Sequence, residues 1–394
     1  MKFLFAGLAL LTLGVASAVH ASTAAFVYES ADVPNTNSSV QAIYGYALSS
    51  SGQLTPIPGE PFAVGDGINY YTACNGSYLF GISWGTSANP TWRSIITYRI
   101  AANGALTKVQ TTPAANYSST SGPHYLYGPL ALDHSGQFLY VGVTGGPDLY
   151  SEYSVMTFQV NHETGALDFL GETPFRGQDT ATIHFTGNDK YAFDENNYEY
   201  LVAGNKTLLL LGNATDAGFD GNDLDPDPLN NLAVVGKNGQ LQSWFVQANG
   251  NLTQHSSDGE TLVRTNLWPD DYREMYFSPD GSILALAGFG LDLYHFNGAR
   301  PITNYKQLYA PGVFNSQTNT TVGTYVSIVA WDNQHHFITL TQNYPSTGVP
   351  GPLYWSIYTA TSTSVEQSYR QVMPQQSYYG FAVQRLGTAL TPID

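Results

Sequence analysis

Gly52-Gln53-Leu54-Thr55 is the first copy of a short sequence that recurs at Gly104-Ala105-Leu106-Thr107, Gly165-Ala166-Leu167-Asp168 and Gly250-Asn251-Leu252-Thr253. Each copy follows a stretch with alternating apolar residues, such as Ile95-Ile96-Thr97-Tyr98-Arg99. Glycine supplies a left-handed backbone conformation between two strands, and the Leu-Thr pair opens the second strand. The copies lie roughly 50 to 85 residues apart, which is too long for an array of hairpins and fits a unit of about four strands repeated around an axis. The sequence therefore predicts a β-propeller.

A second recurrent turn precedes aliphatic and aromatic strands. Asp133-His134-Ser135-Gly136 stands before Phe138-Leu139-Tyr140-Val141, and Ser278-Pro279-Asp280-Gly281 stands before Ile283-Leu284-Ala285-Leu286. Asp and Gly at these places predict a tight hairpin between the first and second strands of a unit. With weaker copies included, the pattern predicts six units that start near residues 69, 128, 181, 225, 273 and 325.

The two ends of the chain supply the remaining strands. Ala25-Phe26-Val27-Tyr28 looks like a second strand without a first, and Gly380-Phe381-Ala382-Val383-Gln384-Arg385 is a lone strand. Pairing them closes the ring and removes its exposed edges. We expect an all-β, seven-bladed β-propeller of four-stranded antiparallel blades, closed by N- and C-terminal strands that share one blade. The sequence between 196 and 227 does not define the outer strands of its blade.

The N-terminus is typical of a secretory signal. Lys2 is followed by an apolar run and by the small residues Ala16-Ser17-Ala18 and Val19-His20-Ala21. This pattern predicts a signal peptide over 1–21, a single propeller domain over 22–394, and a secreted or periplasmic protein. No later apolar run is long enough for a transmembrane helix.

Composition excludes several classes of function. The 394 residues include 14 Lys and Arg against 30 Asp and Glu, for a net charge of −16. This charge and the lack of a basic cluster exclude nucleic acid as a partner. Cys74 is the only cysteine, and we interpret it as a small buried apolar residue rather than a nucleophile. We expect a monomer that needs no cofactor.

Together, the Gly-X-Leu-Thr turns, the Ser-Pro-Asp-Gly hairpin and the Phe-Leu-Tyr-Val strand resemble those of the seven-bladed lactonase-type propellers. That family includes 6-phosphogluconolactonases, 3-carboxy-cis,cis-muconate cyclases and secreted members without an assigned role. The resemblance covers nearly the whole predicted domain, and most of its motifs are turns. It implies the fold more strongly than the activity.

One catalytic position matches the family residue by residue. Arg273-Glu274-Met275-Tyr276-Phe277-Ser278-Pro279-Asp280-Gly281 resembles the family's Ala-Glu-Ile-X-Val-Ser-Pro-Asp-Gly, which places Glu274 on the family's glutamate. Lactone opening needs such an acid or base, together with a cation or donor for the oxyanion. His124 is a second catalytic candidate, two residues before the place where the family has the first histidine of a His-Pro-His pattern.

Other family positions are not retained. No histidine stands between Leu126 and Gly128, Ala287-Gly288 replaces an Asn-Arg pair, and Tyr325-Val326-Ser327-Ile328 lacks an expected arginine. A clamp for a sugar phosphate needs such arginines. These departures argue against phosphosugar lactonase activity.

The loops before the first strand of each blade are rich in aromatic and hydroxyl side chains, which suit neutral polar ligands as well as packing of the rim. Because these loops feed the central channel, we expect substrate-binding residues there, namely Arg273, Arg264, Asp271, Asn69, Tyr70 and Tyr379.

Two further clusters resemble metal sites. Asp220-Gly221-Asn222-Asp223-Leu224-Asp225-Pro226-Asp227 is rich in oxygen ligands, but it lacks the Gly and Glu of a calcium-binding EF-hand and coincides with a blade hairpin. We interpret it as a structural loop, although calcium binding remains the alternative. His335-His336 are adjacent in a strand entry, so their side chains should point to opposite faces and not share a metal.

Two hypotheses follow. In the first, the chain is a binding module for a neutral polar ligand, a glycan or an envelope partner, at the mouth of the central channel, with an eroded lactonase site. In the second, it is an active lactone hydrolase or cycloisomerase with Glu274 as acid or base. Fold alone does not choose between them.

Overall fold

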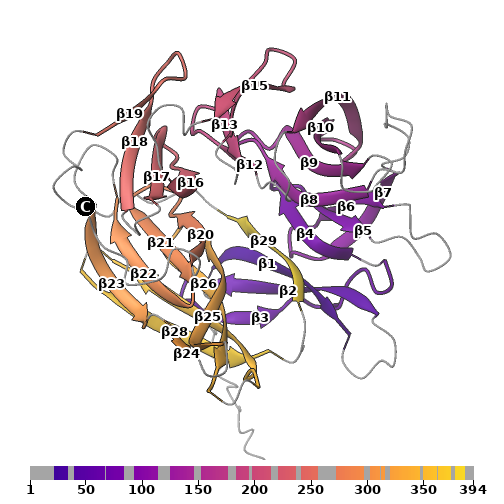
Figure 1. The fold of residues 1–394 in the computed structure, drawn as a ribbon. Coiled ribbons are helices and arrows are strands. Elements are labelled where there is room, and N and C mark those ends of the chain that lie inside the picture. Colours follow the sequence, from indigo (N-terminus) through magenta and orange to yellow (C-terminus); the bar gives the residue numbers. More distant parts are fainter. Residues whose placement is uncertain are drawn as a thin grey trace, which may run out of the picture.

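The structure is a computed structural model, and Figure 1 shows it as a ring of β-sheets. It describes residues 22–33, 40–66, 68–83, 93–113, 125–145, 152–175, 183–194, 198–213, 221–236, 241–255, 272–296, 302–310, 312–315, 320–346, 349–361, 363–373 and 378–386. Within these ranges the chain forms 29 strands in seven antiparallel sheets and no helix. The all-β prediction is confirmed.

Six of the sheets are built from consecutive strands, and the first strand is innermost in all of them except β24–β28, where β25 is innermost. Three of these blades comprise β4 (Ile68–Cys74), β5 (Tyr78–Ser83), β6 (Ser94–Ile100) and β7 (Leu106–Pro113); β8 (Tyr125–Leu132), β9 (Phe138–Gly145), β10 (Glu152–Val160) and β11 (Leu167–Phe175); and β12 (Ile183–Phe185), β13 (Tyr191–Asp194), β14 (Tyr198–Val202) and β15 (Leu208–Asn213). The other three comprise β16 (Gly221–Pro226), β17 (Asn231–Gly236), β18 (Leu241–Val246) and β19 (Leu252–Gln254); β20 (Tyr272–Phe277), β21 (Ile283–Gly288), β22 (Gly290–His295) and β23 (Thr303–Tyr309); and β24 (Val313–Asn315), β25 (Thr320–Trp331), β26 (His336–Tyr344), β27 (Leu353–Ala360) and β28 (Val365–Val372).

The seventh blade joins the two ends of the chain. Its order is β29 (Tyr378–Arg385), β1 (Thr23–Asp32), β2 (Gln41–Ser49) and β3 (Leu54–Pro56). β1 and β29 pair antiparallel with Val27 opposite Val383. The innermost strands contact one another in sequence around the whole ring, from β29 to β4, β8, β12, β16, β20, β25 and back to β29. The predicted closure is confirmed.

One blade departs from the four-stranded expectation. β24 adds a fifth strand beside β25, with Phe314 opposite Thr321. Its hairpin needs close backbone approach, because a Cβ added at Gly323 would lie 2.9 Å from the Cα of Gly312. Short strands of this kind carry too little periodicity to be recognised in a sequence.

The recurrent Gly-X-Leu-Thr turns connect the third and fourth strands of their blades. Gly52, Gly104, Gly165 and Gly250 all have positive φ, between 72° and 88°. In the blade that the sequence left undefined, Lys206 occupies the equivalent position with φ 68°. Because a lysine replaces the glycine there, the repeat is hidden in the sequence although the turn is present.

The turns between the first and second strands also contain a residue with positive φ. Each of the six contains one residue in the left-handed region, namely Gly76, Gly136, Asp189, Asn230, Gly281 and His335. A polar residue that precedes several of these turns caps backbone N–H groups, as when Asp133 Oδ1 accepts from Gln137 N and Phe138 N at 3.0 Å each. The hairpins expected from Asp and Gly are confirmed.

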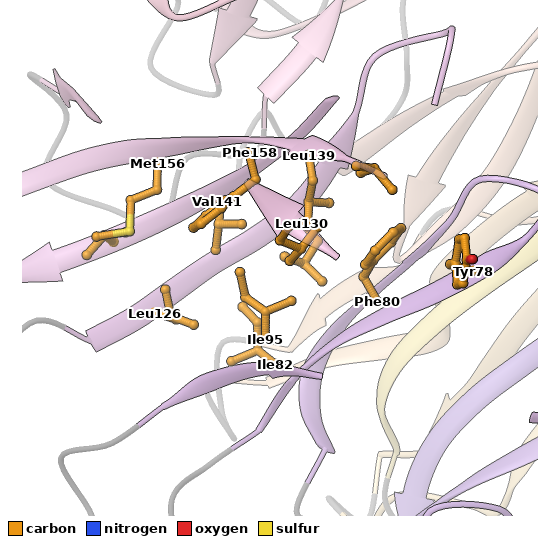
Figure 2. Close-up of a cluster of buried hydrophobic side chains, with 13 residues drawn as sticks. Tyr78, Phe80, Ile82, Ile95, Leu126, Leu130, Leu139, Val141, Met156 and Phe158 are labelled. Atoms are coloured by element: carbon orange, nitrogen blue, oxygen red, sulfur yellow. The ribbon is translucent and has the colours of Figure 1, made fainter. Parts of the chain in front are cut away.

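The core lies between blades. In Figure 2, Tyr78, Phe80 and Ile82 of one blade meet Leu139 and Val141 of the next. All five side chains are buried. Alternate residues of a strand point to opposite faces of its sheet, so each blade contributes apolar residues to two neighbours. The apolar runs of the sequence are therefore explained by burial on both faces.

Candidate functional site

Strand direction divides the molecule into two faces. The first-to-second and third-to-fourth turns lie on one face, which we call the lower face. The upper face carries the starts of the innermost strands and the connections between second and third strands. The described residues among those predicted to bind substrate lie at the starts of the innermost strands β4, β20 and β29. Topology therefore places these strand starts on the upper face.

The side chains of all eight predicted site residues lie outside the described part of the structure. His124, Arg264 and Asp271 lie outside the described residues. The backbones of Asn69 and Tyr70 (β4), Arg273 and Glu274 (β20) and Tyr379 (β29) are described, but their side chains are not. Convergence of these eight residues stays a prediction.

The backbone at Glu274 differs from a regular strand. Tyr272 lies opposite Gly288 and Glu274 opposite Ala287, so Arg273 is an extra residue in β20. This β-bulge interrupts the strict alternation that would send Arg273 and Glu274 to opposite sides. Bulges are common next to active sites, where they redirect side chains.

Asp66 secures the loop that leads into β4. Its Oδ2 accepts a hydrogen bond from the Tyr98 hydroxyl at 2.8 Å, and its Oδ1 lies 2.9 Å from Lys108 Nζ. The hydroxyl of Ser30 donates to the Ile68 carbonyl at 2.6 Å. Both carboxylate oxygens of Asp66 are thus occupied, and the strand that carries Asn69 and Tyr70 starts from an anchored point.

Arg93 is an upper-face residue that the sequence analysis did not select. It stands directly before β6, is buried, and donates from Nη1 to the Leu126 carbonyl at 2.5 Å. The bond joins two neighbouring blades near the start of β8, the strand that follows His124. In the sequence, the feature that could have pointed to Arg93 was a lone arginine just before the third strand of a blade.

Three aromatic rings gather where β20–β23 meets β25–β28 on the upper face. Phe289 follows β21, Tyr325 lies in the upper part of β25, and Tyr344 ends β26. The Phe289 ring centroid is 5.1 Å from that of Tyr325 and 5.6 Å from that of Tyr344. All three are partly exposed. Rings held in this way offer faces for stacking and a hydroxyl for hydrogen bonding.

A buried carboxyl lies at the closing blade. Glu29 of β1 is 1% exposed, and neither of its oxygens has a hydrogen-bond partner in the described structure. Burial raises the pKa of Glu29 to about 8, against a lowering effect of the Trp355 indole and with a further rise from Glu60. The group is therefore a neutral acid at pH 7. In the sequence, the feature that could have pointed to Glu29 was a charged residue within an otherwise apolar strand.

The possible metal-binding residues have other partners. Asp225 Oδ1 lies 2.7 Å from His184 Nδ1, and Asp227 Oδ1 accepts from Leu229 N and Asn231 N. Asp227 thus caps the β16–β17 hairpin, while Asp220 and the Asp223 side chain lie outside the described part. Among described residues, no group of three or more His, Cys, Asp or Glu is placed to hold a metal ion.

The paired histidines point to different carboxylates. His335 Nδ1 lies 3.7 Å from Asp280, in the neighbouring blade, and His336 Nδ1 lies 2.7 Å from Asp332. Cys74 is partly buried, and burial raises the pKa of its thiol to about 12. A protonated thiol is a poor nucleophile. No helix long and apolar enough to cross a membrane occurs in the described ranges.

Comparison with known proteins shows the fold. No family model and no curated protein matches the sequence. A candidate 6-phosphogluconolactonase from Bacteroides uniformis is 13% identical, with a TM-score of 0.52, and the match covers 92% of this chain and 100% of that one. The periplasmic gluconolactonase of Pseudomonas aeruginosa is 14% identical, with a TM-score of 0.48 over 87% of this chain and 98% of its own.

A propeller of another function is also similar. Sqt1 of Chaetomium thermophilum, bound to the N-terminus of ribosomal protein L10, is 12% identical, with a TM-score of 0.46 over 86% of this chain and 85% of its own. The fold that the resemblance to lactonase-type propellers implied is confirmed. At these identities the likeness is one of fold alone.

Proposed function

We propose that this chain is a secreted or periplasmic binding module whose upper face takes a neutral polar ligand, such as a glycan segment or a glycan-bearing envelope partner. The observation that carries the proposal is the partly exposed cluster of Phe289, Tyr325 and Tyr344 beside the upper part of the innermost strand β25. Tyr325 stands in the segment where the family resemblance implied an arginine. A ring there favours stacking on an uncharged ligand over pairing with a phosphate.

The described charged groups on the upper face already have partners within the protein, which also favours a neutral ligand. Asp66 is engaged by Tyr98 and Lys108, and Arg93 is buried against the Leu126 carbonyl. With a net charge of −16, the molecule also repels anionic ligands at long range. Ring stacking and hydrogen bonds are then the main sources of affinity. In this proposal Asn69, Tyr70, Asp271, Arg264, Arg273 and Tyr379 complete the binding surface.

The proposal also includes the signal peptide, the single domain and the oligomeric state of the protein. Residues 1–21 are the signal peptide, 22–394 are a single propeller domain, and the mature protein is a monomer. The first strand, β1, begins at Thr23, close behind the predicted cleavage site.

Calorimetric titration with neutral hexasaccharides of glucose and of N-acetylglucosamine tests the proposal. We expect saturable binding that weakens about fivefold in Tyr325→Ala, because loss of one stacked ring costs on the order of 1 kcal/mol. Tyr354→Ala is the matched control, since that ring lies under Arg370 and is not one of the three clustered rings. Absence of saturable binding, or equal affinity of Tyr325→Ala and the parent protein, would contradict the proposal.

The second candidate function is lactone hydrolysis or cycloisomerisation, with Glu274 as acid or base and His124 as its partner. The sequence match that places Glu274 on the glutamate of the lactonase-type family favours it. Assays with an unphosphorylated sugar lactone and a carboxymuconolactone should then show turnover of at least one of them that falls at least a hundredfold in Glu274→Gln. Glu163→Gln, in an exposed turn, is the control. Turnover that survives Glu274→Gln would exclude this mechanism.

A further inference from the structure

The segment of chain that forms β24 to β27 carries almost no charge. Between Lys306 and Glu366 the sequence contains a single Asp, Glu, Lys or Arg, namely Asp332. Asp332 lies in the turn between β25 and β26, on the lower face, where its Oδ1 accepts hydrogen bonds from the backbone N–H groups of Gln334 and His336. The upper loops of this blade therefore add no charge around the three clustered rings, which favours an uncharged ligand there.

An exposed valine, Val313, continues the apolar surface next to the rings. Its side chain is 69% exposed. The preceding residue, Gly312, donates its N–H to the Phe289 carbonyl at 2.9 Å, and a Cβ added at Gly312 would lie 2.8 Å from the Cβ of Phe289. The start of β24 is thus fastened to the residue that carries the central ring, while the Val313 side chain faces solvent.

A second exposed valine, Val349, stands in the loop that follows Tyr344 and leads to β27. It is 70% exposed, and among the described residues Val313 and Val349 are the most exposed of the large apolar side chains. The loop is fastened by a hydrogen bond from Gly351 N to the Asn343 carbonyl at 2.8 Å. Two anchored segments that adjoin the rings therefore present aliphatic groups to solvent.

The hydroxyl of Tyr344 has a fixed hydrogen-bond polarity. It donates to Oε1 of Gln342 at 3.0 Å, and Nε2 of Gln342 donates to the Gly351 carbonyl at 2.9 Å. A backbone carbonyl can only accept, so the amide nitrogen of Gln342 faces Gly351 and its oxygen faces Tyr344. The one hydrogen of the Tyr344 hydroxyl is thereby used within the protein. Tyr344 Oη offers a ligand lone pairs only, and it selects a donor.

An acetamido group on a sugar matches both features of this surface. Its N–H is a donor of fixed direction for Tyr344 Oη, and its methyl group is an apolar partner for an exposed valine, whose burial is favourable. A sugar hydroxyl can instead rotate its hydrogen towards another acceptor, so an unmodified glucose unit gains less from a partner that only accepts.

We propose that the upper face of β24–β28 selects N-acetylated neutral glycans. The three rings stack on the sugar units, Tyr344 Oη accepts from an acetamido N–H, and Val313 and Val349 contact acetyl methyl groups. Gln342 is a positioning residue, because it acts through the Tyr344 hydroxyl. This inference rests on the proposed glycan-binding function and adds the class of glycan and the residues that select it.

Calorimetric titration with hexasaccharides of N-acetylglucosamine and of glucose that share the same linkage tests the selectivity. We expect the N-acetylglucosamine chain to bind about tenfold more tightly, because a hydrogen bond and a buried methyl group both contribute. Equal affinities, or tighter binding of the glucose chain, would overturn this inference and leave glycan binding itself in place. If neither chain binds saturably, the proposed function is wrong and the inference fails with it.

Tyr344→Phe keeps the ring and removes the acceptor. It should weaken binding of the N-acetylglucosamine chain about fivefold and of the glucose chain by less than about twofold. Val313→Thr and Val349→Thr, which replace one methyl group by a hydroxyl, should each lower the ratio of the two affinities about twofold. Val109→Thr, at a 39% exposed valine of β7, is the matched control and should keep the parent ratio. A ratio that is unchanged in Tyr344→Phe and in both valine variants would overturn the assignment of these residues.

Discussion

At the scale of single residues, the third-to-fourth turns combine a backbone requirement with a packing requirement. Gly104 has φ 84°, and a Cβ added there would lie 2.7 Å from a ring carbon of Phe26 in the preceding blade. Gly165 and Gly250 similarly approach Tyr78 and Tyr191. Lys206 tolerates the same conformation, with its Nζ 5.2 Å from the Phe138 ring centroid. At Gly104, Gly165 and Gly250 the glycine therefore meets a packing requirement as well as a backbone requirement, because an added Cβ would lie less than 3 Å from a neighbouring ring.

Gly104→Ala should therefore destabilise the protein by roughly 2 kcal/mol or more, because it adds a left-handed alanine and a clash with Phe26. Gly204→Ala is the matched control, since no atom lies within 4 Å of the added Cβ. It should be neutral or stabilising by less than about 1 kcal/mol. Urea unfolding monitored by tryptophan fluorescence measures both. Equal stability of the two variants would contradict this account of the turn.

At the scale of elements, four tyrosines join second strands to turns of the next blade. The hydroxyls of Tyr28, Tyr78, Tyr140 and Tyr191 donate to the carbonyls of Gly104, His162, Lys206 and Ala248, at 2.8 to 3.2 Å. Each bond links two consecutive blades on the lower face. The recurrent turn is therefore a joint between blades as well as a connection within one.

Tyr140→Phe should cost about 1 kcal/mol of unfolding free energy, because it removes one such hydrogen bond and leaves the Lys206 carbonyl without its donor. Tyr369→Phe, on the outer strand β28, is the control and should change stability by less than about 0.5 kcal/mol. Thermal and urea unfolding report both values. A neutral Tyr140→Phe would mean that water replaces the hydroxyl and that the joint depends on packing alone.

At the scale of the whole molecule, buried acids make stability depend on pH. Burial raises the pKa of Glu29 to about 8, of Glu199 to about 7 and of Asp227 to about 6. Their pKa values in the unfolded chain are near 4, so between about pH 4 and pH 8 the folded state binds more protons than the unfolded state. Stability should then be highest on the acidic side of this window and fall as pH rises through it.

The unfolding free energy should accordingly be larger at pH 5 than at pH 8. Glu29→Gln should raise it at pH 8 by about 3 kcal/mol and flatten the profile, since a buried neutral amide cannot ionise. Glu163→Gln, at an exposed turn, should reproduce the parent profile. Chemical unfolding across this pH range provides the measurement. A parent protein that gains stability towards pH 8 would contradict the assignment of Glu29 as a neutral acid.

The fold was accessible from the sequence because its signals are local. A left-handed turn residue and alternating apolar strands depend on a few consecutive residues, so Gly52, Gly104, Gly165 and Gly250 mark their turns directly. The signal failed where local residues deviate, at Lys206 and at the short strand β24. Much less of the candidate site was accessible. The β-bulge at Arg273, the burial of Arg93 and the neutral state of Glu29 each depend on a neighbouring strand or blade.

By itself, the sequence determined the blade repeat, the closure by the chain ends and the excess of negative charge. Only the tertiary structure decided which distant residues meet. Arg385 reaches the Trp331 carbonyl because ring closure brings the closing blade beside its neighbour, and no spacing along the chain encodes that distance. The repeat that opened the sequence is thus more than a count of blades. At Gly104, Gly165 and Gly250 it also marks where one blade packs on the next, because a Cβ added there would lie less than 3 Å from a ring of the neighbouring blade.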